Sequence, residues 1–536
     1  MPSSPVDDPR YDVIVVGAGV GGLYAVHRLR ERGLRVLCLE AGGGVGGVWY
    51  HNAYPGARVD VESIDYCYWF SPELYRDWRW TERYAAQPEL RRYLEHVADR
   101  FALRPHLRLN TAVTGARWTG DRYEITAGTG ERFGARFLVM ATGNLSAARE
   151  PAFPGLGEYA GEWVQTSHWP EGGIDVAGRR IAVIGTGSSG VQTVTEIAKT
   201  AEHVVVFQRT PNYSVPAHNG PLDEKRWSEI AADVPKVRRE LLETRGGQHI
   251  PRGELPTTAL DAAGRRAQLE RAWESGGHAF NAVFPDQGVD AAANAVVADF
   301  VKDRIRERVG NPALAEKLVP YDHPIGTRRL CVDTGYYEVY GQDNVTLVDA
   351  RDEPIESLTR TGVRTRTGHH DVDLVVFALG FHAFRGAIDG AGIRNGAGAA
   401  PTDAWDRGPR TVLGLMTHGF PNLFTLTGAG SPSVLANMTL MNEVHVDWVA
   451  DCIGYLDAHG HRTIEPTREA EDEWGGVVAA AADRLLRRQV RNYMAHVNED
   501  GSRVFMPYIG GLDTYIEQAT AIAEAGYRGF MLDGRR

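Results

Sequence analysis

The stretch that decides the fold is Tyr11-Asp12-Val13-Ile14-Val15-Val16-Gly17-Ala18-Gly19-Val20-Gly21-Gly22. Its first half is a short, apolar, β-branched run, which predicts a strand that ends at Gly17. Residues 23–32 then carry apolar side chains at helical spacing, Gly33 stops the helix, and residues 35–39 read as a second strand. The glycine-rich loop therefore lies between the first strand and the helix of a predicted βαβ unit.

A second copy of this design lies further along the chain. A strand is predicted at Arg180–Ile184, a loop at Gly185-Thr186-Gly187-Ser188-Ser189-Gly190, a helix at residues 191–199 and a strand at residues 204–208. In such a loop the first glycine allows a tight turn, the second lets a pyrophosphate approach the backbone, and the third lets helix and strand pack closely. One such loop is a weak signal, but two in βαβ context predict two dinucleotide sites.

The residue that ends the second strand of each unit distinguishes the two nucleotides. Glu40 ends it in the first unit, where a carboxylate accepts hydrogen bonds from ribose hydroxyls and repels a 2′-phosphate, which favours FAD or NAD. The second unit has no acid there, and Arg209 offers charge-assisted hydrogen bonds to a 2′-phosphate. Arg209 could instead be an ordinary solvated arginine, but its place at a strand end favours the phosphate. The loops are therefore predicted to hold FAD and NADPH.

The remaining sequence predicts the domain organisation. Between residues 216 and 320 strand patterns vanish, and charged amphipathic runs at 234–244 and 291–309 predict a mostly helical insertion. Strands are predicted at 345–348, 372–378 and 423–427, and helices at 442–456 and 469–490. The predicted fold class is α/β, with two Rossmann-like dinucleotide-binding domains, the second interrupted by the helical insertion. The predicted segments are 1–147 and 381–536 for the FAD-binding domain, 148–215 and 326–380 for the NADP-binding domain, and 216–325 for the insertion.

Composition argues against several classes of function. The chain has 536 residues and a formal net charge of −11, which disfavours nucleic acid as a partner, since phosphate binding needs a basic surface. Its four cysteines form no Cys-x-x-Cys pair and its 18 histidines form no metal-binding motif, so we expect reduced thiols and no metal. No apolar run is long enough to span a bilayer, and the polar N-terminal residues show no signal peptide. We therefore expect a cytoplasmic protein without membrane contact.

Several further motifs together resemble those of the type I Baeyer–Villiger monooxygenases, most closely the phenylacetone and steroid monooxygenase branch. The resemblance runs from about Tyr11 to the C-terminus, and no single motif would be specific. The motifs are Gly46-Gly47-Val48-Trp49-Tyr50, Tyr54-Pro55-Gly56-Ala57-Arg58-Val59-Asp60-Val61-Glu62-Ser63, Ala141-Thr142-Gly143, Phe207-Gln208-Arg209-Thr210-Pro211, Gly326-Thr327-Arg328-Arg329-Leu330, Gly408-Pro409-Arg410-Thr411, Phe420-Pro421-Asn422-Leu423-Phe424 and Arg503-Val504-Phe505-Met506.

Three positions depart from the family pattern. The family fingerprint FxGxxxHxxxW is similar to the segment from Tyr159 to Trp169, but Gln165 stands where the family has a histidine. Gln165 still forms hydrogen bonds but carries no charge, which bears on the coupling of NADPH use to product. The second Ala-Thr-Gly-type turn contains Leu379 in place of threonine, and Asn492 stands where the family usually has a tryptophan in a mobile loop.

The resemblance implies a reaction. NADPH reduces FAD, the reduced flavin forms a C4a-peroxyflavin with O2, and the peroxide attacks a ketone to give an ester or lactone. The cofactor carries the chemistry and the protein must orient it and stabilise negative charge. Arg329 matches the family's catalytic arginine, and Asp60 matches the acid that holds it. A solvated basic turn is the competing interpretation of Arg328 and Arg329, and the motif context argues against it.

The resemblance also implies the binding residues, together with the two glycine loops. The predicted FAD contacts are Gly17, Gly19, Gly22, Glu40, Gly47, Val48, Trp49, Asp60, Tyr66, Val113 and Met438. The predicted NADP contacts are Arg58, Thr186, Gly187, Ser188, Ser189, Gly190, Gln192, Arg209, Thr210 and Arg328. The predicted substrate contacts are Ser433, Val434, Leu435 and Met438, for which an ordinary apolar core is the competing interpretation.

Two other functions stay open at this point. One is a flavin monooxygenase that oxygenates sulfur or nitrogen, and the other is a flavoprotein that oxidises NADPH without oxygenating a substrate. The products formed from a ketone and from a sulfide distinguish these alternatives from ketone oxygenation. The sequence does not reveal which ketone is used or the oligomeric state.

Overall fold

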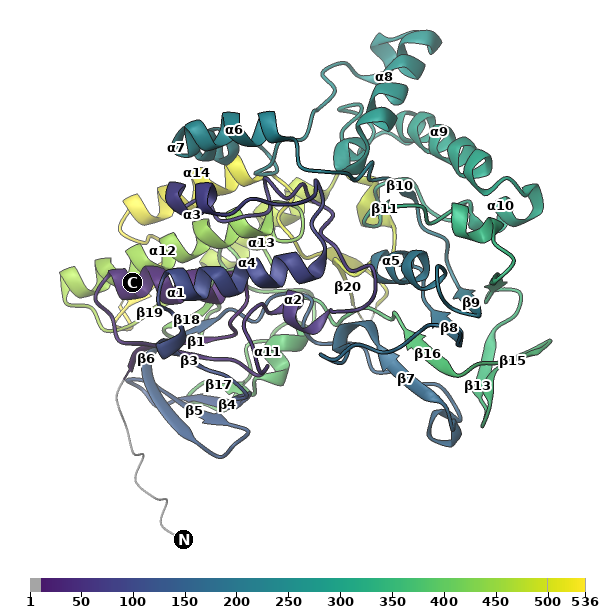
Figure 1. Ribbon diagram of the computed structural model, residues 1–536. Coiled ribbons are helices and arrows are strands. Elements are labelled where there is room, and N and C mark those ends of the chain that lie inside the picture. The colour runs from purple at the N-terminus through teal and green to yellow at the C-terminus, as the bar shows by residue number, and fades with distance from the viewer. Residues whose placement is uncertain (1–10, 499, 536) are drawn as a thin grey trace.

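The first glycine loop lies where the sequence predicts it, between β1 (Tyr11–Val16) and α1 (Val20–Glu31) (Figure 1). The computed structural model describes residues 11–498 and 500–535. The expectation of no signal peptide rests on residues 1–10, which lie outside the described residues. β2 (Val36–Leu39) follows α1 and runs parallel to β1, with Val13 opposite Val36. The first βαβ unit is therefore confirmed.

An eight-stranded sheet is built around β1, in the order β17-β4-β5-β6-β1-β2-β3, with β18 also paired to β6. Strands β18, β6, β1, β2 and β3 form parallel pairs, whereas β4, β5 and β6 form an antiparallel meander. The bounds are β3 (Leu107–Arg108), β4 (Val113–Trp118), β5 (Tyr123–Ala127), β6 (Arg132–Met140), β17 (Ile393–Arg394) and β18 (Leu423–Thr425). This first sheet thus combines strands from the two ends of the chain.

The second glycine loop belongs to a separate five-stranded sheet, in the order β12-β9-β8-β16-β7, in which every pair is parallel. Its strands are β7 (Glu162–Gln165), β8 (Arg180–Ile184), β9 (His203–Gln208), β12 (Val345–Asp349) and β16 (Leu374–Phe377), and α5 (Ser188–Ile197) follows the loop. Both predicted nucleotide folds are therefore present.

The outer glycines of both loops are required by close packing. A Cβ on Gly17 would lie 2.7 Å from the Ala141 carbonyl oxygen, and one on Gly185 would lie 2.4 Å from the Ala378 carbonyl oxygen. Both glycines have positive φ, +103° and +115°, which other residues rarely adopt. A Cβ on Gly22 would lie 1.8 Å from the Gly17 carbonyl oxygen. Each loop is thus clamped against the turn that ends a neighbouring strand.

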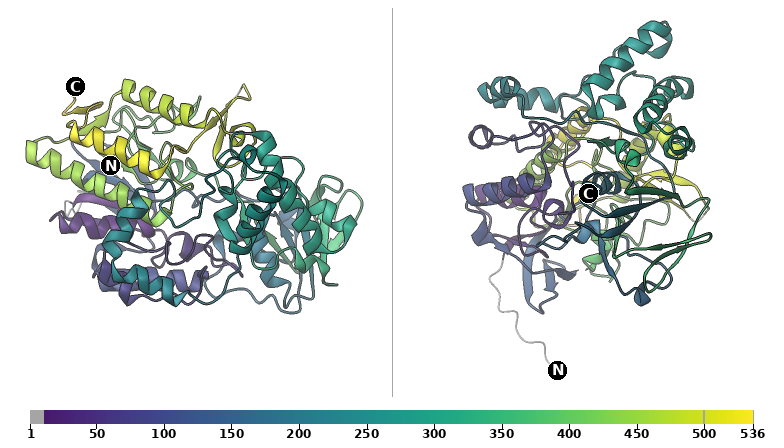
Figure 2. Two further views of the ribbon diagram at one scale, coloured as in Figure 1. Left: turned by 90° about the horizontal axis from the view of Figure 1, so that it is seen from above. Right: turned by 45° about the vertical axis from the view of Figure 1, so that its right-hand side comes forward.

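The segment predicted as an insertion is helical and extends along both sheets. Helices α6 (Glu224–Ala232) and α7 (Val234–Leu242) contact α3 (Pro72–Asp77) and α14 (Leu512–Glu524), beside the first sheet. Helices α8 (Ala262–Ser275), α9 (Ala291–Val309) and α10 (Pro312–Leu318) lie on the side of the second sheet, as Figures 1 and 2 show. The exact boundaries of the domains remain a prediction.

The C-terminal third corrects one predicted helix. α12 (Met438–His459) is present, but the helix predicted at 469–490 ends early, as α13 (Arg468–Ala482). The apolar pair Leu485 and Leu486 leaves the helix to pack inward, and the Leu486 amide donates to the Gly288 carbonyl. A short 3-10 helix, Leu486–Gln489, follows. Burial of these two leucines therefore overrides the helical periodicity.

The remaining α-helices and strands of the described residues complete the fold. They are α2 (Val48–His51), α4 (Gln87–Arg100), α11 (Gly386–Gly390), β10 (Ser214–Pro216), β11 (Cys331–Asp333), β13 (Ile355–Leu358), β14 (Gly362–Thr365), β15 (His369–Asp371), β19 (Ile464–Pro466), β20 (Ala495–Val497), β21 (Arg503–Phe505) and β22 (Phe530–Leu532). None of the helices within the described residues is both long and apolar enough to cross a bilayer.

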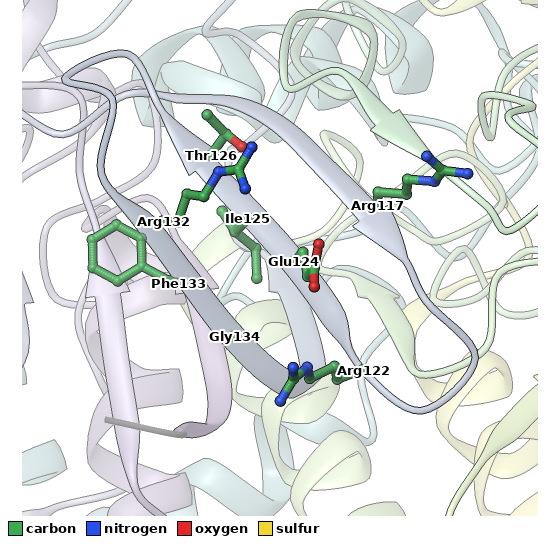
Figure 3. Close-up of a pocket in the computed structure, with 8 residues that line it drawn as sticks. All are labelled: Arg117, Arg122, Glu124, Ile125, Thr126, Arg132, Phe133 and Gly134. Atoms are coloured by element: carbon green, nitrogen blue, oxygen red, sulfur yellow. The ribbon is translucent and has the colours of Figure 1, made fainter. Parts of the chain in front are cut away.

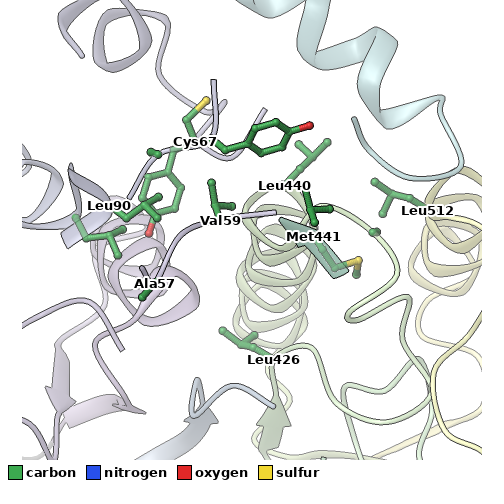
Figure 4. Packing of buried hydrophobic residues seen from close by; sticks show 14 of the residues in the cluster. Ala57, Val59, Cys67, Leu90, Leu426, Leu440, Met441 and Leu512 are labelled. Atoms are coloured by element: carbon green, nitrogen blue, oxygen red, sulfur yellow. The ribbon is translucent and has the colours of Figure 1, made fainter. Parts of the chain in front are cut away.

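The main core joins segments that are far apart in the sequence. Figure 4 shows Val59 from the first part of the chain beside Leu440 and Met441 of α12, and Leu90 belongs to the same buried cluster. Leu512 of α14 belongs to the same buried cluster. The N-terminal βαβ unit is therefore stabilised by helices from the C-terminal third.

A buried ion pair ties the insertion to this core. Glu443 of α12 is fully buried, and its Oε1 accepts the amide protons of Trp69 and Phe70, at 2.5 and 3.1 Å. The Arg238 guanidinium of α7 donates to its Oε2 at 3.0 Å. Burial raises the pKa of Glu443 to about 7, against the lowering effect of Arg238. The carboxylate therefore depends on Arg238 to remain charged.

We expect Arg238→Ala to destabilise the protein by about 3 kcal/mol, because it leaves a buried carboxylate without its counter-charge. The folded-state pKa of Glu443 lies above the unfolded value of about 4.3, so its contribution to stability falls as pH rises through 7. Loss of Arg238 raises that pKa further. The drop in melting temperature should therefore be larger at pH 8 than at pH 6. Arg239→Ala, at the exposed neighbour, is the control; an equal drop for both variants would contradict the assignment.

Candidate active site between the two sheets

A bidentate ion pair joins the predicted catalytic residues. Arg329 donates from Nε to Asp60 Oδ2 at 2.8 Å and from Nη2 to Asp60 Oδ1 at 2.7 Å. Its Nη1 donates to the Val434 carbonyl at 3.1 Å. Three of its five N–H donors are used in these contacts, and Tyr493 forms a further side-chain hydrogen bond with Arg329. The structure therefore brings together residues from three distant segments around one cation.

The pair is held in its charged form. Burial by itself would raise the pKa of Asp60, but Arg329 and then His278 outweigh it and hold that pKa well below its usual range. Burial likewise opposes the charge on Arg329, and Asp60 more than offsets it, so the pKa of Arg329 is raised. Each charge thus depends on the other, because an unpaired charge in this environment costs several kcal/mol, about 3–5.

His278 is a neighbour of this pair that the sequence interpretation missed. Its Nε2 lies 3.4 Å from Asp60 Oδ2, and its Nδ1 lies 2.8 Å from Asn281 Nδ2. It comes from a 3-10 helix in the insertion, Gly277–Asn281. The only sequence signal is the preceding pair Gly276-Gly277, both with positive φ, which marks a sharp turn. The insertion therefore reaches the ion pair.

Trp49 and Tyr66 form an aromatic corner close to the ion pair. Trp49 Nε1 donates to the Tyr66 hydroxyl at 3.1 Å, and the rings meet edge-on, with centroids 5.8 Å apart. Burial raises the pKa of Tyr66 to about 12, and Asp60 contributes in the same direction. A mostly apolar corner of this kind, with few polar atoms, suits the ring system of a flavin.

The residues predicted to hold the first nucleotide lie together at the carboxyl ends of β1 and β2. Glu40 is buried, and its two oxygens accept the amide protons of Ala18 and Gly42 at 2.6 and 2.7 Å. Although burial opposes ionisation, hydrogen bonds lower the pKa of Glu40. Val113 begins β4, and the Thr111 amide just before it donates to the Glu40 carbonyl at 2.7 Å.

The turn before α2 covers the first glycine loop. The Gly46 amide donates to the Ala18 carbonyl at 3.0 Å, and a Cβ on Gly47 would lie 2.9 Å from Gly19 Cα. Val48 begins α2 directly after this contact. The predicted residues Gly17, Gly19, Gly22, Gly47 and Val48 are thus one compact group.

The second loop has free space in front of its middle glycine. A Cβ on Gly187 would meet no protein atom within 4 Å, whereas one on Gly190 would lie 2.0 Å from the Gly185 carbonyl oxygen. Ser188 and Ser189 form the first turn of α5, and the Thr186 hydroxyl donates to the Thr210 carbonyl at 3.1 Å. The open face at Gly187, next to free amides of a helix N-terminus, fits a pyrophosphate.

The first part of the chain packs directly on α5. Tyr54 donates from its hydroxyl to Gln192 Oε1 at 2.9 Å, and Gln192 Nε2 donates to the Arg58 carbonyl at 3.1 Å. The Arg58 guanidinium donates to Glu82 Oε2 and to the Tyr84 carbonyl, each at 2.7 Å. Arg58 thus meets α5 through its backbone, while its side chain is engaged by Glu82.

Arg209 and Arg328 lie on neighbouring segments beyond β9. β10 and β11, which follow the two segments, run side by side, and Asn212 Nδ2 donates to the Arg329 carbonyl at 3.0 Å. Arg209 is exposed, and Arg328 lies 3.6 Å from Asp322 in a loose ion pair. Two cations at this edge suit the 2′-phosphate that distinguishes NADP.

The predicted substrate loop contains a strained residue. Val434 has a φ of +59°, which is uncommon for a β-branched side chain and of the kind found at functional sites. The Val434 amide donates to Met438 Sδ at 3.4 Å, and the Ser433 hydroxyl is held by Asn144 Nδ2. Leu435 and Val434 are half-buried. The strain turns the Val434 carbonyl toward Arg329.

Comparison with known proteins identifies the family. The family described as "Pyridine nucleotide-disulphide oxidoreductase" matches residues 11–232. A Baeyer-Villiger monooxygenase of Pseudooceanicola batsensis is 36% identical, over 98% of this chain and 96% of that protein. The chain belongs to the Baeyer–Villiger monooxygenases. An acetone monooxygenase (methyl acetate-forming) of Gordonia sp. (strain TY-5) is 37% identical, over 97% of this chain and 99% of that protein. The solved structure "Oxidized steroid monooxygenase bound to NADP" has a TM-score of 0.93 and 48% identity, over 98% of this chain and 99% of that chain.

This Baeyer–Villiger monooxygenase is therefore an oxidoreductase that uses FAD, NADPH and O2 to convert ketones to esters or lactones. The predicted family, the α/β fold class and the two cofactors are confirmed. The roles of individual site residues remain predictions.

The three departures from the family pattern lie in different surroundings. Gln165 of the Baeyer–Villiger monooxygenase is buried at the end of β7, and its Nε2 donates to Glu150 Oε2 at 3.2 Å. Four residues later the Trp169 amide donates to the His51 carbonyl of α2 at 3.3 Å, which joins the two sheets. Leu379 packs in the core of the second sheet, and Asn492 closes a turn by donating to the Val490 carbonyl at 2.9 Å.

A cavity of about 220 Å³ lies away from this site, on the meander β4-β5-β6. Figure 3 shows Arg117, Arg122 and Arg132 around Ile125 and Phe133 on these strands. None of its lining residues is among the predicted site residues of this monooxygenase. This cavity is therefore not assigned to the reaction.

Two of the three glycines in the second loop allow a sharp test of nucleotide binding. Gly187→Ala places its Cβ in free space, so we expect a folded, FAD-containing enzyme whose KM for NADPH rises at least about tenfold, because the pyrophosphate loses its close approach. Gly190→Ala collides with the Gly185 carbonyl, so we expect a lower melting temperature. Gly157→Ala, which also meets no neighbour, is the control. An unchanged KM for NADPH in Gly187→Ala would contradict the assignment of the pyrophosphate to this loop.

Proposed function

We propose that Arg329 is the catalytic residue of this Baeyer–Villiger monooxygenase and that Asp60 positions it. The observation that carries the proposal is the bidentate pair, which fixes one permanently charged guanidinium beside the proposed substrate loop. Oxygenation of a ketone develops negative charge on oxygen, and a preorganised cation in a partly buried site stabilises such charge. Arginine suits the role because it stays protonated even when buried.

The first loop is the proposed FAD site. FAD, when bound, supplies hydride acceptance from NADPH and the activation of O2. The residues present fit it: the helix N-terminus after Gly19 would hold the pyrophosphate, Glu40 would hold the ribose, and Trp49 and Tyr66 would contact the ring system. The proposed FAD contacts are Gly17, Gly19, Gly22, Glu40, Gly47, Val48, Trp49, Asp60, Tyr66, Val113 and Met438.

The second loop is the proposed NADP site. The open face at Gly187 and the cations Arg209 and Arg328 support it. The proposed NADP contacts are Arg58, Thr186, Gly187, Ser188, Ser189, Gly190, Gln192, Arg209, Thr210 and Arg328. The substrate is a small ketone, and we place it against Ser433, Val434, Leu435 and Met438, because Val434 already contacts Arg329 through its carbonyl.

We also propose a cytoplasmic location with neither membrane nor nucleic acid as a partner. The four cysteines within the described residues are all free and buried, as is usual in a reducing compartment. The net charge of −11 gives no general surface for phosphate backbones.

Replacement of Arg329 tests the catalytic assignment. We expect Arg329→Ala to lower lactone formation from a cyclic ketone by at least about 100-fold, since the developing negative charge loses its counter-charge. NADPH oxidation should persist in part, because the nucleotide sites remain. Lactone and NADPH are followed together by mass spectrometry and absorbance, and an aryl methyl sulfide serves as a second substrate.

Arg117→Ala, on the distant meander, is the control for the loss of a surface arginine. Lactone formation that survived in Arg329→Ala would show that another group stabilises the charge. Sulfoxide as the only product of the unaltered enzyme would instead favour sulfur oxygenation.

A further inference from the structure

A second arginine, Arg487, lies beside the segment that carries Arg329. Arg487 belongs to the 3-10 helix Leu486–Gln489, between α13 and β20. Its Nε and Nη2 donate to the Gly326 carbonyl, at 2.9 and 2.5 Å. Gly326 begins the segment Gly326-Thr327-Arg328-Arg329. The guanidinium of Arg487 is therefore held next to the loop that carries Arg329.

Arg487 differs from Arg329 in having no counter-charge. Within residues 11–498 and 500–535, no carboxylate forms an ion pair with it. Burial and then the charge of Arg329 lower the pKa of Arg487 to about 10, although Tyr493 acts in the opposite direction. A half-buried cation next to another cation costs free energy unless an anion approaches. The site therefore favours a negatively charged ligand.

The surroundings place this cation on the substrate side of Arg329. Val434 and Leu435, from the proposed substrate loop, pack in one cluster with Leu485 and Tyr493. Leu485 and Tyr493 flank Arg487 in the sequence, and the Tyr493 side chain interacts with Arg329 as well. An apolar wall thus leads from the catalytic arginine toward Arg487.

The segment around Arg487 is strongly basic in an otherwise acidic protein. Residues 484–491 contain four arginines, Arg484, Arg487, Arg488 and Arg491. In the part of the chain that the structure describes, only Arg488 forms an ion pair, with Asp483. Arg484 and Arg491 are exposed. Unpaired cations in a row attract anions from solution, even when the net charge is negative.

We propose that Arg487 binds an oxyanion on the substrate, so that the ketones used by this enzyme carry a carboxylate. Two of the five N–H donors of Arg487 hold Gly326, which leaves three, enough for a bidentate contact with a carboxylate. The phosphates of NADP offer the same oxyanion chemistry, but the packing with Val434 and Leu435 favours the substrate. The proposal rests on the proposed location of the ketone beside Arg329.

A matched pair of ketones tests the proposal with the FAD-loaded enzyme. (2-Oxocyclopentyl)acetate and its methyl ester share one skeleton and differ in charge. We expect the unaltered enzyme to favour the acid by at least about tenfold in kcat/KM, which is about 1.4 kcal/mol, and to bind it more tightly in a flavin difference spectrum with NADP⁺ present. Arg487→Gln, which removes the charge and keeps an N–H donor, should lower this preference about tenfold through the KM for the acid. Arg487→Lys should restore part of it.

Arg488→Gln, at the exposed neighbour, is the control and should leave the preference unchanged. Equal binding of acid and ester by the unaltered enzyme would overturn the proposal. A preference for the acid that is the same in Arg487→Gln as in the unaltered enzyme would also overturn it. If Arg487→Gln instead had a higher KM for NADPH and kept the preference for the acid, Arg487 would be assigned to the nucleotide phosphates. Tighter binding of the acid without lactone formation would contradict the proposed location of the reacting ketone and leave the role of Arg487 standing.

Discussion

The ion pair between Asp60 and Arg329 joins residues that are 269 positions apart in the chain. Asp60 belongs to the part of the chain that carries the first glycine loop, and Arg329 follows the insertion into the second sheet. Neither charge is stable alone in this partly buried place, so the pair forms only when both sheets and the insertion are in position. The reacting centre is thereby made dependent on the relative placement of the two nucleotide folds.

The insertion contributes more than spacing between strands. It reaches buried acids of the first part and of α12 at three points: His278 approaches Asp60, His249 Nδ1 lies 2.6 Å from Asp65 Oδ1, and Arg238 binds Glu443. Each contact neutralises or hydrogen-bonds an acid that would otherwise be poorly solvated. A displacement of the insertion therefore changes the charge balance around Asp60 directly, which couples helix packing to the chemistry of the site.

Cations are distributed unevenly around this site. Arg329 is neutralised by Asp60, whereas Arg209 is exposed and Arg487 has no acid partner among the described residues. A neutralised arginine is fixed in place and serves the developing charge of a reaction, while an unpaired arginine is available to a permanently charged ligand. This difference distinguishes catalysis from the recognition of phosphates and carboxylates.

Local sequence patterns determined both glycine loops, the helical character of the insertion and the contrast between Glu40 and Arg209, because turns, helices and strand ends depend on residues close together in the chain. The resemblance to a family added Asp60 and Arg329, which no local pattern could pair. Only the tertiary structure decided that α13 ends at Ala482, that His278 meets Asp60, that Val434 is strained and that Arg487 lies beside Gly326. These features arise from packing and charge between segments hundreds of residues apart, and such long-range contacts leave no periodic signal in the sequence.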